Sequence, residues 1–113
     1  MHELPVTKSI LNICQEEVKK HGMEKVIAVN IRVGELTGLV PTGIEYYFEI
    51  IAKGTVAEGA KINIKKIPVN IECKDCGESF ECRKGVYNCI NCSSNNIKIT
   101  GGREFLIDTL EMD

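Results

Sequence analysis

The sequence predicts an α+β fold in which two helices pack on a small mixed or antiparallel sheet, with a cysteine-rich lobe inserted. Three observations predict this fold. Apolar residues recur every three or four positions in two segments and alternate in several others, which are the periods of helices and strands. Five of the six cysteines fall between Cys73 and Cys92. The segment after them regains a strand-like apolar composition, so the lobe interrupts one domain.

The first predicted element is a helix from about Leu4 to His21. Its last turn is basic, Gly22 is expected to stop it, and His21 is expected to cap its end. One apolar stripe is expected to face the core, formed by Val6, Ile10, Ile13, Cys14 and Val18.

A strand is predicted next, from about Lys25 to Val33. Its alternating apolar positions, which indicate one buried face, are Ile27, Val29, Ile31 and Val33.

Glycines and a proline then mark the segment from Gly34 to Pro41 as a loop. A second helix is expected from Thr42 to Lys53, with Gly54 at its end. Its apolar face consists of Ile44, Tyr47, Phe48 and Ile51.

Further strands are predicted on both sides of the cysteine-rich lobe. Apolar alternation begins near Lys61 and changes phase beside Pro68, which indicates a bulge or a change of strand partner. Two last strands, residues 97–100 and 104–110, flank a Gly101-Gly102 turn. We therefore expect one α+β domain from residues 1–70 plus 100–113, and a separate lobe from residues 71–99.

Two C-x-x-C pairs predict a metal site in this lobe. Cys73 and Cys76 form the first pair, Cys89 and Cys92 the second, and twelve residues separate the pairs. Four thiolates at this spacing can close one tetrahedral zinc site, which makes the lobe zinc-ribbon-like and leaves no open position for catalysis. Iron in the same site and a pair of disulfides are the alternatives.

The two remaining cysteines have simpler interpretations. Cys82 lies between the two pairs and is read as a bystander thiol, with a competing role during metal exchange as the alternative. Cys14 lies on the apolar stripe of the first helix, where a small core residue is expected.

Charge, apolar runs and the residue types present disfavour three classes of protein: nucleic-acid-binding proteins, membrane proteins and enzymes. The net charge of −2 and the mixed charges of the lobe disfavour a nucleic-acid-binding or transcription accessory protein, which is the alternative that zinc ribbons suggest. The sequence has neither a signal-peptide pattern nor a run of eighteen apolar residues, so we expect a cytoplasmic protein without membrane partners. No catalytic set of nucleophile and base is evident, and an enzyme is not expected.

The start of the chain offers a second metal site. The amine of Met1, the backbone nitrogen of His2 and its imidazole can close adjacent chelate rings, and Glu3 can complete the set. Deprotonated amide nitrogens favour planar Ni(II) or Cu(II). Many chains begin Met-His by chance, so an idle, exposed histidine is the alternative from the residues alone.

These features together resemble one family. Met1-His2-Glu3-Leu4 opens a helix, Ile31–Leu36 ends a strand, the two cysteine pairs follow, and the tail reads Gly101-Gly102-Arg103-Glu104-Phe105. In this order and at this length the chain closely resembles the HypA/HybF family of hydrogenase maturation nickel chaperones. The resemblance runs from the first residue to the last strand.

The resemblance implies a function. Family members bind one Ni(II) at the amino terminus through His2 and nearby backbone nitrogens, with support from Glu3. They hold one structural zinc through cysteines that match Cys73, Cys76, Cys89 and Cys92. They act with the GTPase HypB to insert nickel into the large subunit of [NiFe] hydrogenase, and some also serve urease. Some members carry an acidic side chain in the loop after the first strand, but residues 36–41 contain none. We expect a monomer or a weak or domain-swapped homodimer.

Overall fold

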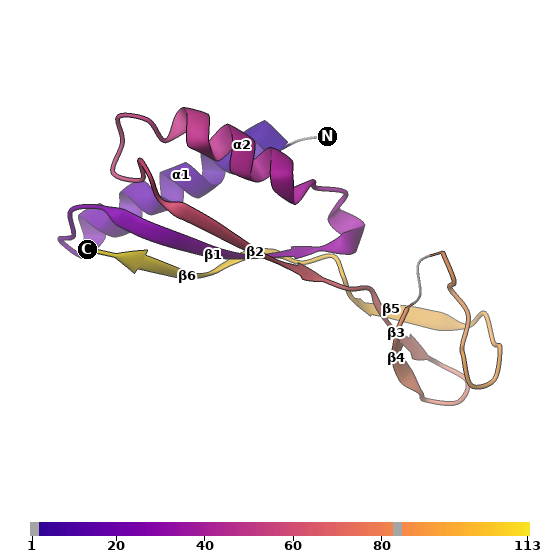
Figure 1. Ribbon diagram of the computed structural model, residues 1–113. Coiled ribbons are helices and arrows are strands. Elements are labelled where there is room, and N and C mark those ends of the chain that lie inside the picture. Colours follow the sequence, from indigo (N-terminus) through magenta and orange to yellow (C-terminus); the bar gives the residue numbers. More distant parts are fainter. Residues whose placement is uncertain (1–2, 83–84) are drawn as a thin grey trace.

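The computed structural model describes residues 3–82 and 85–113 (Figure 1). The described chain is elongated, with principal extents of 54 × 26 × 17 Å. Neither α-helix in these residues has the length and apolar character needed to cross a bilayer. The elements are α1 (Glu3–Lys20), β1 (Val26–Gly34), the 3-10 helix η1 (Glu35–Thr37), α2 (Pro41–Ile51), β2 (Lys61–Ile67), β3 (Asn70–Cys73), β4 (Ser79–Glu81), β5 (Ile97–Gly101) and β6 (Phe105–Met112).

The larger sheet has the order β2-β1-β6. Strands β1 and β2 are parallel, and α2 is the crossover between them, as a parallel pair requires. Strand β6 pairs with the other edge of β1 in the antiparallel direction, so the sheet is mixed. Both helices lie on the same side of this sheet (Figure 1). The predicted α+β class and its mixed sheet are confirmed.

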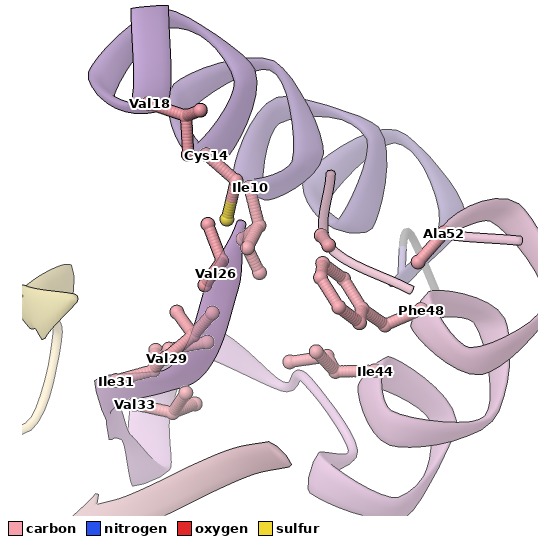
Figure 2. Close-up of a cluster of buried hydrophobic side chains, with 11 residues drawn as sticks. Ile10, Cys14, Val18, Val26, Val29, Ile31, Val33, Ile44, Phe48 and Ala52 are labelled. Carbon is pink, nitrogen blue, oxygen red and sulfur yellow. The ribbon is translucent and has the colours of Figure 1, made fainter. Parts of the chain in front are cut away.

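The hydrophobic core lies between the two helices and β1. Ile10 and Cys14 of α1, Ile44 and Phe48 of α2, and Val29 of β1 are each at most 1% exposed, and Figure 2 shows them converging on one volume. Burying side chains of this size contributes roughly 1.5–3 kcal/mol each, so this cluster stabilises the helix–sheet packing.

Two apolar residues were placed wrongly by sequence periodicity. Ile13 is 39% exposed, because the buried face of α1 runs through Thr7, Ile10 and Cys14 and leaves Ile13 at its border. Ile27 is 48% exposed, because the register of β1 against β6 shifts between Val26 and Ala28 and turns Val26 inward in its place.

The end of α1 is also arranged differently from the prediction. His21 does not cap the helix, since its Nε2 lies 3.0 Å from Oε2 of Glu17 one turn earlier. Gly22, the predicted stop residue, has a left-handed φ of +63°.

The predicted loop contains the short 3-10 helix η1. Helix α2 then begins at Pro41, a position where a backbone N–H would have no partner within the helix, so proline loses no hydrogen bond there.

The smaller sheet has the order β4-β3-β5 and is antiparallel. The phase change beside Pro68 is a change of partner: β2 ends at Ile67 paired with β1, and β3 begins at Asn70 paired with β4 and β5. Gly101 and Gly102 do not join a hairpin, because β5 belongs to the smaller sheet and β6 to the larger one. The lobe is therefore inserted between β2 and β6, as predicted (Figure 1).

Both connections to the smaller sheet pass through one point, which we call the neck (residues 34, 68–69 and 101–103). A Cβ on Gly34 would lie 2.2 Å from the carbonyl oxygen of Gly102, and a Cβ on Gly102 would lie 2.9 Å from the Cα of Val69. The backbone N–H of Leu36 donates to the Gly102 carbonyl at 2.7 Å. Three backbone segments can approach this closely only because two of the residues are glycines.

Gly34→Ala should therefore destabilise the protein by about 3 kcal/mol, the upper range for overpacking, because the added methyl group meets backbone atoms that cannot rotate away. Gly34 has a φ of −72°, so alanine itself is not strained there. Gly22→Ala is the matched control, since its φ is +63° but no atom lies within 4 Å of its Cβ. We expect that control to lose only about 1–2 kcal/mol, the cost of a left-handed φ for alanine. Urea unfolding measures the free energy of unfolding of the two variants. Equal losses in Gly34→Ala and Gly22→Ala would contradict the close approach of backbones at the neck.

Candidate metal centre

The smaller sheet brings four cysteine thiols together. The sulfurs of Cys73, Cys76, Cys89 and Cys92 all lie within 4.8 Å of one another. The Sγ atoms of Cys73 and Cys92 are 3.7 Å apart, and those of Cys76 and Cys89 are 3.5 Å apart. Four thiolates at a Zn–S distance of about 2.3 Å on a tetrahedron would be separated by about 3.8 Å. The four side chains therefore fit a metal ion of this kind.

The two C-x-x-C segments have the same backbone arrangement. In the first, Cys73 N–H donates to the carbonyl of Glu78 at 2.8 Å, and Gly77 N–H donates to the carbonyl of Cys73 at 2.9 Å. In the second, the matching bonds run from Cys89 to Ser94 and from Ser93 to Cys89, each at 2.9 Å.

The residue after each second cysteine is left-handed, with a φ of +80° at Gly77 and +61° at Ser93. Glycine adopts this conformation without steric cost, whereas Ser93 is a non-glycine residue in the same conformation. Each segment thus forms a knuckle that presents two sulfurs.

Hydrogen-bond donors point at the sulfurs. The backbone N–H groups of Asn91 and Cys92 donate to Sγ of Cys89 at 3.3 and 3.4 Å, and Nδ2 of Asn91 donates to Sγ of Cys76 at 3.7 Å. Donors of this kind stabilise thiolates, the form in which cysteine binds a metal.

A carboxylate joins the two knuckles. Asp75, between the first two cysteines, accepts hydrogen bonds from Oγ of Ser94 and, at 3.1 Å, from Nδ2 of Asn96. These two bonds lower the pKa of the Asp75 carboxyl below its ordinary value, so it is ionised at neutral pH. Sequence reasoning missed this contact, because nothing local relates residue 75 to residues 94 and 96.

The closeness of the four thiols makes it unfavourable to deprotonate them unless a cation is bound. The backbone hydrogen bond with Ser94 lowers the pKa of Cys92, but desolvation and the three neighbouring thiols outweigh it and raise that pKa to about 12. A bound dication reverses this balance, because coordinated thiols are deprotonated. The predicted disulfide alternative is wrong, since all six cysteines are free. Sulfur tetrahedra accept zinc and iron alike, and zinc is the usual ion of closed four-cysteine sites.

The two remaining cysteines lie outside the cluster. Sγ of Cys82 donates to the backbone carbonyl of Val86. Cys14 is fully buried in the helical core, where burial raises the pKa of its thiol to about 11. The Cys14 thiol is therefore protonated at neutral pH, and the prediction of a small core residue is confirmed.

The second predicted site lies at the start of the chain. Met1 and His2 are outside the described residues. Glu3 is the first residue of α1 and is only 8% exposed. Its Oε2 accepts a hydrogen bond from the backbone N–H of Val40 at 3.2 Å, and this bond is the main reason that the pKa of its carboxyl is lowered.

Sequence reasoning did not connect Glu3 with the start of α2. The nearest atoms to a Cβ on Gly43 would be those of Glu3, the closest being Cγ at 3.1 Å. One signal was available, because glycine inside a helix is unfavourable and often marks a close approach.

A family profile, individual sequences and solved structures were compared with this chain, and all three point to the same family. Residues 1–112 match the sequence profile of the family described as "Hydrogenase/urease nickel incorporation, metallochaperone, hypA". Hydrogenase maturation factor HypA of Caldanaerobacter subterraneus is 35% identical, and that of Geobacter metallireducens is 34% identical, each over all of both chains.

Solved structures agree with these sequence matches. The solution structure of the Ni metallochaperone HypA from Helicobacter pylori is 30% identical, with a TM-score of 0.66 over 99% of this chain and 97% of that one. A second structure, the solution structure of HypA protein, is 32% identical with a TM-score of 0.74 over 99% and 96%. Profile, sequence and fold thus agree along the whole chain, which belongs to the HypA family of nickel-incorporation metallochaperones of hydrogenase maturation.

Proposed function

We propose that this protein binds one Ni(II) at its amino terminus and delivers it for the maturation of [NiFe] hydrogenase. In this proposal the Met1 amine and the backbone nitrogen and imidazole of His2 bind the nickel, and Glu3 supports the site. One zinc ion, held by Cys73, Cys76, Cys89 and Cys92, is structural. The observation that carries the proposal is family membership over residues 1–112, a match that includes the tripeptide Met1-His2-Glu3.

The chemistry of the chain end suits a carrier. Deprotonated amide nitrogens select Ni(II) over zinc, calcium and magnesium, so the site discriminates among the ions it meets. Ligands contributed by a chain end can be removed one at a time, which permits transfer to a partner. His2 must be neutral to bind, so nickel affinity should fall as the pH drops through about 6.5, the ordinary pKa of histidine.

The cysteine lobe needs its metal for stability. Among the described residues of the lobe, the buried apolar ones are few: Ile71, Cys73 and Cys89. A unit of this size rarely folds on apolar burial alone, and a structural zinc commonly supplies the missing free energy. We therefore propose that residues 71–99 form a zinc-braced lobe, and that residues 1–70 with 100–113 form the nickel-binding domain.

The proposed partners follow from the delivery of nickel. We propose a HypB-type GTPase as the helper and the large subunit of [NiFe] hydrogenase as the recipient, with urease as a second client. The protein would work in the cytoplasm as a carrier and not as a catalyst, because a closed four-sulfur site leaves no position for substrate. It would act as a monomer or a weak or domain-swapped dimer.

His2→Ala should weaken nickel binding by more than about 100-fold, the upper range for losing a residue that only supports a metal ligand. The reason is that the imidazole is the one side-chain nitrogen of the chelate. Zinc should remain near one per chain, because the proposed sites are separate. Nickel titration of untagged protein, with metal analysis, measures both quantities. Equal loss of the two metals would show that the sites are not independent.

Extension of the chain by one residue before Met1 should also weaken nickel binding. The extension converts the Met1 amine, a neutral donor, into an amide and moves the free amine out of the chelate ring. A calorimetric titration compares the chain that begins at Met1 with the chain that carries the one extra residue. An unchanged Kd would remove the Met1 amine from the ligand set.

Cys73→Ser should lower the zinc content well below one per chain and unfold the lobe, because its buried thiol at the end of β3 is one of four proposed ligands. Cys82→Ser is the matched control in the same lobe and should keep its zinc. Metal analysis and helical circular dichroism distinguish lobe unfolding from global unfolding. Equal zinc loss in both variants would contradict the proposed ligand set.

A further inference from the structure

Helix α2 receives its amino-terminal cap from the other helix. Val40, the residue before α2, makes no side-chain cap, and the first turn of α2 holds no acidic residue. In a capping box, a glutamate at the third helical position accepts a hydrogen bond from the backbone N–H of the cap residue. Glu3 of α1 makes that bond instead, with its Oε2 3.2 Å from the Val40 nitrogen.

Gly43 provides the room for this contact. It occupies the third position of α2, counted from Pro41, where a capping glutamate would otherwise stand. A Cβ at this position would lie 3.1 Å from Cγ, 3.6 Å from Cβ and 3.7 Å from Cδ of Glu3. Glycine in a helix costs about 1 kcal/mol relative to alanine. An unfavourable residue thus stands where the side chain of Glu3 crosses α2.

We infer that Gly43 is a positioning residue for nickel binding: it lets Glu3 lie across the first turn of α2, and this contact fixes the position of the residue that directly follows His2. The inference rests on the proposed function. Glu3 directly follows His2 in the chain, so a displacement of Glu3 is passed on to the metal-binding segment. In this role Glu3 acts through its shape and its hydrogen-bond acceptor, and it does not need to donate to nickel.

The experiment compares side chains of increasing size at position 43. Gly43→Leu should raise the nickel Kd by about tenfold, typical of lost support behind a metal ligand, and Gly43→Ala by less, because one methyl group requires a smaller shift of Glu3. Zinc content should hold, because the cysteine cluster belongs to the other sheet, and the gain in helix propensity at position 43 offsets part of the stability lost with the cap of α2. Thr42→Leu is the matched control, because it adds a side chain to the same turn at an exposed position.

Substitutions of Glu3 separate positioning from ligation. Glu3→Gln keeps the shape and an acceptor for the Val40 N–H, so it should lose less nickel affinity than Glu3→Ala, whereas Glu3→Ala should lose about as much as Gly43→Leu. In the Glu3→Ala background, Gly43→Leu should add little, because both changes remove the same contact.

Each outcome decides one question. If Gly43→Leu bound nickel like Thr42→Leu, or if Glu3→Gln lost as much affinity as Glu3→Ala, the inference would be overturned while the proposed function stood. If the unmodified, untagged chain took up no nickel, the proposed function itself would fail. His2→Ala, measured in the same series, marks the level of binding without the chelate.

Discussion

The close approach of backbones at the neck is the constraint on which the arrangement of the molecule depends. Two strand connections, one on each side of the inserted lobe, converge on the end of β1. They fit because Gly34 and Gly102 have no side chains, and hydrogen bonds of 2.7 Å from Gly34 to Glu104 and from Leu36 to Gly102 hold them there. The neck therefore ties the lobe to the same segment that leads into α2.

The two parts of the chain are stabilised by different physical effects. The larger sheet and its helices bury a continuous cluster of aliphatic side chains around Phe48, so the hydrophobic effect accounts for their packing. The smaller sheet has little apolar surface to bury, and its order comes from two knuckles that share a backbone pattern and point four sulfurs at one point. This difference explains how a lobe rich in polar residues remains folded at the end of an elongated molecule.

The beginning of the chain is connected to the core more closely than its residue types suggest. A glutamate at position 3 would ordinarily be exposed, yet Glu3 is buried against the first turn of α2. The positive end of that helix favours a carboxylate, which offsets the cost of burial. The segment between Gly34 and Val40 thus contacts the neck at one end and Glu3 at the other, so the connection to the lobe and the start of the chain meet the same short stretch of backbone.

Most of the elements and the sulfur cluster could be predicted from the amino-acid sequence, because both depend on local spacing. Periodicity located the two helices and strands β1, β2, β5 and β6 but not β4, the phase change beside Pro68 indicated a bulge or a change of partner, and the two C-x-x-C pairs predicted four converging thiols. Tertiary structure alone decided that Ile13 and Ile27 are exposed and that Asp75 and Glu3 bridge distant segments. The physical reason is that periodicity reports a residue's own polarity, whereas burial and hydrogen bonding depend on residues tens of positions away in the chain.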